Sequence, residues 1–88
     1  MKTTPHPYPA YPARYRLRLQ GRMSVDWTDW LSNPETSLES FGTTTLTTLT
    51  GQVTDQAALF GLLSFVRDLG LTLISVEYLP EGNQENEL

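Results

Sequence analysis

The most regular hydrophobic pattern in the chain lies between residues 53 and 70. Apolar side chains recur there at three- and four-residue spacing, which places them on one face of a helix: Leu59, Leu62, Leu63, Val66 and Leu69. Thr54 or Asp55 can accept hydrogen bonds from the first amides, and Gly70 can adopt the left-handed conformation that ends a helix. The pattern predicts an amphipathic helix whose apolar face must be covered by another element.

Strand periodicity is found after this helix and also at the start of the folded part of the chain. After Gly70, a side carrying Ile74, Val76 and Tyr78 alternates with a second side, which predicts a strand with one face more buried. Residues 15–20 predict a first strand with Tyr15, Leu17 and Leu19 on one face, and its opposite face is basic: Arg14, Arg16 and Arg18.

Two further strands are predicted in the threonine-rich middle, because threonine favours strand over helix. They span residues 36–41 and 45–53, around a turn at 42–44. Leu46 and Leu49 have opposite parity, so either a bulge intervenes or one of them points outward. Gly51 indicates a bend or a close backbone approach.

A short helix is predicted over residues 24–31. Ser24 can cap it, while Trp27, Trp30 and Leu31 are spaced i, i+3 and i+4. We interpret the tryptophans as core residues rather than ligand-stacking groups, because large aromatics dominate burial in a small domain. Asp26 and Asp29 then lie on a solvent face with no histidine nearby, which disfavours an acid–base or metal site.

This order of elements predicts an α+β, ferredoxin-like βαββαβ fold, with two helices on one face of a four-stranded antiparallel sheet. The first and third strands would occupy the centre, and the last strand would lie at an edge beside the first. The other sheet face would stay open. An open face and an open edge must be protected or used.

The chain divides into three parts. Residues 1–13 are rich in proline and predict an extended, disordered arm that includes a weak PxxP pattern at 9–12. Residues 14–79 form the single domain. Residues 80–88 predict a disordered acidic tail.

Composition narrows the chemistry. Without cysteine there is no disulfide, thiolate zinc site or cysteine nucleophile, and His6, in the arm, is the sole histidine. No metal spacing or glycine-rich phosphate loop appears, so we expect no enzyme activity, no catalytic residues and no cofactor. No apolar run approaches the roughly 18 residues of a membrane helix, and residues 2–13 lack the apolar region of a signal peptide. The default expectation is a cytoplasmic protein without a membrane partner.

The net charge of −4 conceals a segregation of charge. All cations except Arg67 lie within residues 1–22, and all ten acidic residues follow them. This polarity could serve head-to-tail self-association or a weak anionic partner. The acidic total and the lack of an exposed aromatic pair disfavour nucleic acid, so we expect the arginines of the first strand either to be solvated or to pair across strands with Glu39 or Glu77.

Part of the chain resembles a known signature. The run GQVTDQAALFGLL at 51–63, followed by VRDLGL at 66–71 and LISV at 73–76, is similar to the DQAALHGLL…RDLGL.L.SV signature of a widespread family of small uncharacterised bacterial proteins. The resemblance spans 15–79 and implies a small α/β domain without an established activity or cofactor. Phe60 stands where that family commonly has histidine, so any chemistry of that histidine is absent here.

Phe60 is also set apart by geometry. It lies about 100° around the helix from Leu59, shares a flank with Ser64 and Arg67, and should be partly exposed. We interpret Phe60, Ser64, Arg67, Arg14, Arg16 and Arg18 as a candidate interaction surface. The sequence therefore favours a non-enzymatic protein-interaction or self-associating module that binds another copy or another protein. The alternative is a small-molecule-binding regulatory domain with its ligand site at a subunit interface.

Overall fold

The computed structural model describes residues 10–80, so the predictions for 1–9 and 81–88 lie outside it. Its elements are β1 (Ala13–Gln20), β2 (Ser32–Phe41), β3 (Thr44–Val53), α1 (Gln56–Asp68) and β4 (Leu73–Leu79). The strands form one antiparallel sheet in the order β2-β3-β1-β4. The α+β class is confirmed, as are the central places of β1 and β3 and the edge place of β4 beside β1.

The hydrophobic core lies between α1 and the two central strands. Alternation on β1 turns Leu17 and Leu19 toward the helix, and the register sets Leu17 opposite Leu49 of β3. From the helix, Leu62 and Val66 are buried against them, with Leu59 at the margin. The predicted apolar face of the helix is confirmed at these three positions, whereas Leu63 is half-buried and Leu69, which caps the helix, is exposed.

Both ends of α1 are defined by the expected chemistry. Asp55, one of the two predicted caps, accepts a hydrogen bond from the backbone N–H of Ala58 at 2.8 Å, which satisfies one of the amides that a helix leaves unpaired. Gly70 has a φ of +74°, and its N–H donates to the carbonyl of Arg67. Positive φ favours glycine, so the chain can turn here into β4.

The helix predicted over 24–31 is wrong, and with it the two-helix ferredoxin-like arrangement; α1 is the only helix among residues 10–80. The chain from Arg22 to Trp27 is extended and is followed by one turn. The Asp26 carboxylate accepts from both the N–H and the hydroxyl of Thr28, at 3.0 and 2.6 Å. Such local side-chain bonds compete with helical hydrogen bonding.

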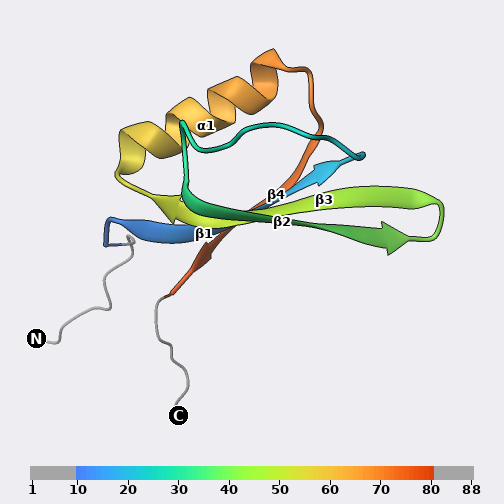
Figure 1. The fold of residues 1–88 in the computed structure, drawn as a ribbon, viewed down its shortest axis with the longest axis horizontal. Helices are drawn as coiled ribbons and strands as arrows, with labels where there is room; N and C mark the ends of the chain where they lie inside the picture. The colour runs from blue at the N-terminus through green and yellow to red at the C-terminus, as the bar shows by residue number, and fades with distance from the viewer. Residues whose placement is uncertain (1–9, 81–88) are drawn as a thin grey trace, which may run out of the picture.

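The tryptophans still serve the core as predicted. Trp27 is buried, and its ring meets the edge of Phe65 with centroids 5.9 Å apart. Trp30 is half-buried, with its ring centroid 5.6 Å from that of Phe65, and it lies so close to the helix that a methyl group on Gly61 would come within 2.7 Å of its Cζ3. The segment joining β1 to β2 thus runs on the same side of the sheet as α1, beside one flank of the helix (Figure 1).

The β2–β3 hairpin resolves the register that the sequence left open. Phe41 pairs with Thr44 across a two-residue turn whose first residue, Gly42, has a φ of +63°, as a type II′ turn requires. Pairing is regular from Leu46 to Leu49, so Leu49 faces the helix and Leu46 faces the open side. The irregularity lies instead in β2, between Ser32 and Glu35. At Gly51 the close approach is confirmed, since a Cβ there would lie 3.0 Å from that of Leu31.

Truncation of Leu62 tests this core. Leu62→Ala should lower the free energy of unfolding by about 2–5 kcal/mol, because the side chain is fully buried and truncation leaves a cavity. Leu63→Ala is the matched control and should cost less, since Leu63 is half-buried. Urea unfolding followed by tryptophan fluorescence measures both. A cost below about half a kilocalorie for Leu62 would place the helix face elsewhere.

Candidate interaction surfaces

The three arginines of β1 project from the sheet face opposite α1, where each is paired with a glutamate. Arg18 is the centre of the network: its Nε lies 3.2 Å from Glu39 Oε1, and its Nη1 lies 2.7 Å from Glu77 Oε1. Arg16 Nη1 reaches the same Glu77 oxygen at 3.3 Å. Arg14 pairs more loosely with Glu35, at 3.7 Å. The predicted pairing of this strand with Glu39 and Glu77 is confirmed.

These contacts keep the glutamates ionised. A hydrogen bond from the Thr48 hydroxyl, 2.7 Å away, and the Arg18 guanidinium lower the pKa of Glu39. Hydrogen bonds from Arg18 and Arg16 lower the pKa of Glu77. The positive charge of β1 is therefore compensated within the face, which presents a neutral polar surface rather than the basic stripe of a nucleic-acid site.

The three helix residues predicted as part of the interaction surface do not lie beside the β1 arginines. Phe60 is 56% exposed, as expected. Ser64 is half-buried, and Arg67 is exposed with its Nε 3.1 Å from Asp68 Oδ1. Because β1 alternates, its leucines face the helix and its arginines face away. The sheet therefore separates Phe60, Ser64 and Arg67 from the β1 arginines, and the six residues do not form one surface.

Among residues 10–80, four of the eight large hydrophobic residues that are exposed lie on the edge strand β4. We call Leu73, Ile74, Val76 and Tyr78 the β4 stripe; their side chains are between 38% and 50% exposed. A strand with one face more buried is predicted here, and the less exposed positions are Ser75 and Glu77, not the apolar Ile74, Val76 and Tyr78. Val76 and Tyr78 do share the face of Leu17 and Tyr15 on β1, but they lie one strand beyond the helix's central contacts. Ile74 is the extra residue at a bulge.

Phe60 is a further exposed apolar side chain, on α1. The flank of α1 that carries Gly61 and Phe65 is covered by Trp30. Phe60 lies roughly 100–140° around the axis from those two residues, so it belongs to the flank turned away from Trp30. The segment that carries Trp30 leads into β2, so the Phe60 flank is not covered by that segment.

The opposite edge strand, β2, has the features of a protected edge. It contains Pro34, which has no N–H to donate, and the charged residues Glu35 and Glu39. Proline and charges are how native sheets block edge-to-edge pairing. Leu38 and Phe41 are exposed on this strand, but they point to opposite faces of the sheet. The two edges therefore differ: β4 carries four exposed apolar side chains, and β2 carries two that point to opposite faces.

The geometry defines an α+β domain with one covered sheet face and one ion-paired face. In the described part of the chain, no cluster of three or more histidine, cysteine, aspartate or glutamate side chains could hold a metal. No helix there is long and apolar enough to cross a membrane.

The chain belongs to the family described as "Domain of unknown function (DUF8691)", which matches residues 14–77. The expectation of an uncharacterised family is confirmed to that extent. Comparison with curated proteins and with solved structures gave no match. No activity is therefore carried to this chain by similarity.

The ion-paired face makes stability depend on pH. Because the pKa values of Glu39 and Glu77 are lower in the folded chain than their ordinary 4.5, the stabilisation is present above that value and is lost as the pH falls through the lower, folded-state values. Unfolding measured from about pH 6 to about pH 3 should show the double variant Glu39→Gln/Glu77→Gln losing less stability than the wild type.

Glu35→Gln is the matched control, because it removes one carboxylate of the same face from a longer and more exposed pair. It should change the pH dependence less than Glu39→Gln alone or Glu77→Gln alone. An acid limb of equal slope in the double variant and the wild type would mean that these contacts do not stabilise the fold.

Proposed function

We propose that this chain is a non-enzymatic self-association module that pairs with a second copy of itself through the β4 edge. The observation that supports this proposal is the exposed β4 stripe. Scattered exposed leucines are ordinary, whereas a row of apolar side chains on an unpaired strand marks an interaction site or an aggregation hazard. Pairing of two such edges would satisfy outward-facing N–H and C=O groups and bury the stripe in the same step.

The charge on β4 favours a second copy as the partner. Glu77 is the strand's one charged residue, and Arg16 and Arg18 already neutralise it. In an antiparallel pair of β4 strands with Val76 on the two-fold axis, Glu77 faces Ser75 of the second copy. Tyr78 then faces Ile74, an aromatic and β-branched pair of the kind that stabilises sheets. A register centred on Glu77 would oppose two carboxylates and is disfavoured.

A dimer related by a two-fold axis uses both of its β4 edges, so the association stops at two copies. Pairing of β4 with β2 of another copy would be heterologous and would continue into a filament. The proline and glutamates of β2 oppose that arrangement. Phe60, exposed on the helix flank that Trp30 leaves uncovered, would add apolar area to the association. The bacterial setting that accompanies this proposal rests on the family resemblance, and the cytoplasmic location is the default expectation.

Charge placed on the stripe tests the proposal. The wild type should sediment as a dimer at about 100 µM and dissociate on dilution, since association depends on concentration by mass action. Val76→Lys should be monomeric at that concentration, because the two-fold axis sets the two new charges directly opposite each other. Ile74→Lys should also be monomeric, because it replaces the apolar partner of Tyr78 with a charge. Phe60→Ala should fold like the wild type and associate more weakly.

Ser40→Lys is the matched control. It adds the same charge to an exposed position of the β2 edge and should leave the dimer intact. Analytical ultracentrifugation and circular dichroism together measure mass and folding. A wild type that stays monomeric at about 100 µM, or a folded Val76→Lys variant with the wild-type mass, would contradict pairing through β4.

A further inference from the structure

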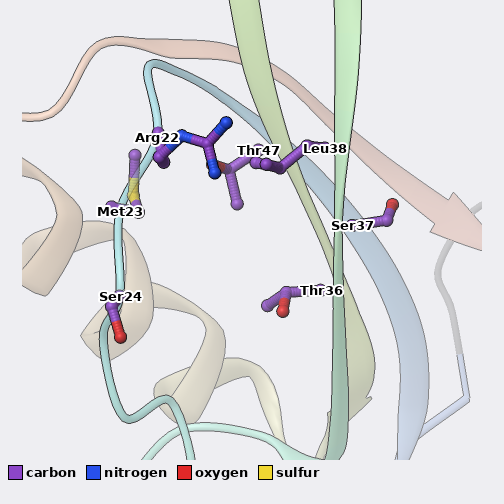
Figure 2. A pocket seen from close by; sticks show the side chains of 7 residues that line it. All are labelled: Arg22, Met23, Ser24, Thr36, Ser37, Leu38 and Thr47. Carbon is purple, nitrogen blue, oxygen red and sulfur yellow. The ribbon is translucent and has the colours of Figure 1, made fainter.

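A cavity of about 500 Å³ lies on the other side of the molecule from β4, between β2 and the chain that leaves β1. Figure 2 shows its walls: Arg22, Met23 and Ser24 on one side, and Thr36, Leu38 and Thr47 on the other. Ser37 also borders it, but its side chain points away from the opening. The volume is in the range of small-molecule sites.

The cavity exists because the chain that leaves β1 is extended and does not form a helix. Met23, Val25 and Trp27 turn inward from that segment and pack against the core. An extended chain covers less of the sheet than a helix does, since a helix is about 10 Å across. Leu38 of β2 consequently stays 46% exposed on the sheet face that carries α1, and it forms an apolar wall of the cavity.

Arg22 sets the chemistry of this cavity. Among the arginines in residues 10–80, it alone has no carboxylate of that same range within 4.0 Å; the other four pair with glutamate or with Asp68. Its guanidinium extends across the mouth of the cavity beside Thr47 (Figure 2). A guanidinium presents a planar fork of donors that fits a carboxylate in a bidentate manner.

The remaining walls divide into an apolar part and a polar part. Leu38 and Met23 supply apolar surface, and Thr36 points its hydroxyl and methyl groups from β2 toward the opening (Figure 2). The Thr47 hydroxyl is already committed, because it donates to the carbonyl of Gly21 at 2.7 Å. The hydroxyls of Thr36 and Ser24 have no hydrogen-bond partner within the described part of the protein and are available to a ligand.

We propose that this cavity binds a small monocarboxylate with a short apolar body. The carboxylate pairs with Arg22, and the apolar body lies against Leu38 and Met23. A single negative charge fits better than a doubly charged phosphate, because one guanidinium is present in a chain whose net charge is −4. The walls contain no aromatic ring on which a nucleobase could stack.

This proposal is independent of self-association. The cavity lies over β2, and the β4 stripe lies at the opposite edge of the sheet. A variant that abolishes pairing through β4 should leave the cavity's binding unchanged. The failure of one proposal therefore leaves the other standing.

Nuclear magnetic resonance titration with hexanoate tests the site. The ¹⁵N-labelled full chain should show saturable amide shifts confined to the cavity walls, including Met23, Leu38 and Thr47. Arg22→Gln should weaken hexanoate binding at least tenfold, because the charged partner is removed. Hexylammonium, with the same apolar chain and the opposite charge, should produce no saturable shift.

Arg67→Gln is the matched control, since it removes the same charge from an exposed helix position distant in sequence from the cavity. It should bind hexanoate like the wild type. Arg22 is exposed, so Arg22→Gln should keep the wild-type spectrum outside the cavity. Equal hexanoate affinity in Arg22→Gln and wild type, equal binding of hexylammonium, or shifts that never saturate would each overturn the proposal.

Discussion

One helix has to cover a sheet of four strands, and the rest of the structure follows from that constraint. A helix is about 10 Å across, and neighbouring strands are about 4.8 Å apart, so α1 spans about two strands. Leu62 and Val66 place it over the central pair, where Leu17 and Leu49 complete the core. Both edge strands are left without cover from the helix.

The two edge strands and the open sheet face differ in what covers them. On the β2 side, the segment that carries Trp27 and Trp30 takes the place of a second helix and leaves a cavity beside Arg22. On the β4 side, the apolar stripe stays exposed. The face opposite α1 is occupied by arginine–glutamate pairs around Arg18, which make it polar and electrically balanced.

The hydrophobic periodicity of the sequence correctly predicted the elements in which the spacing of side chains alone determines which residues are buried. The alternation on β1 was sufficient to predict both the core leucines and the glutamate-paired arginines, and the leucine spacing predicted α1 with its Asp55 cap. The helix prediction for residues 24–31 failed because a helical period and a strand-like alternation overlap there. Trp27 and Trp30 fit a helix, while Met23 and Trp27 belong to an alternating run, and the bonds of Asp26 to Thr28 favour the second. The exposure of β4 depends on how many layers cover the sheet, which its own sequence does not encode.

The central claim is that the β4 edge is used for pairing with a second copy. Amide hydrogen exchange at two protein concentrations tests it most directly, because only an edge that becomes paired gains backbone protection on association. We expect the β4 amides that point away from β1 to exchange more slowly at high concentration, and those of β2 to be unchanged. Exchange in β4 that is independent of concentration, or protection gained in β2 instead, would contradict the account.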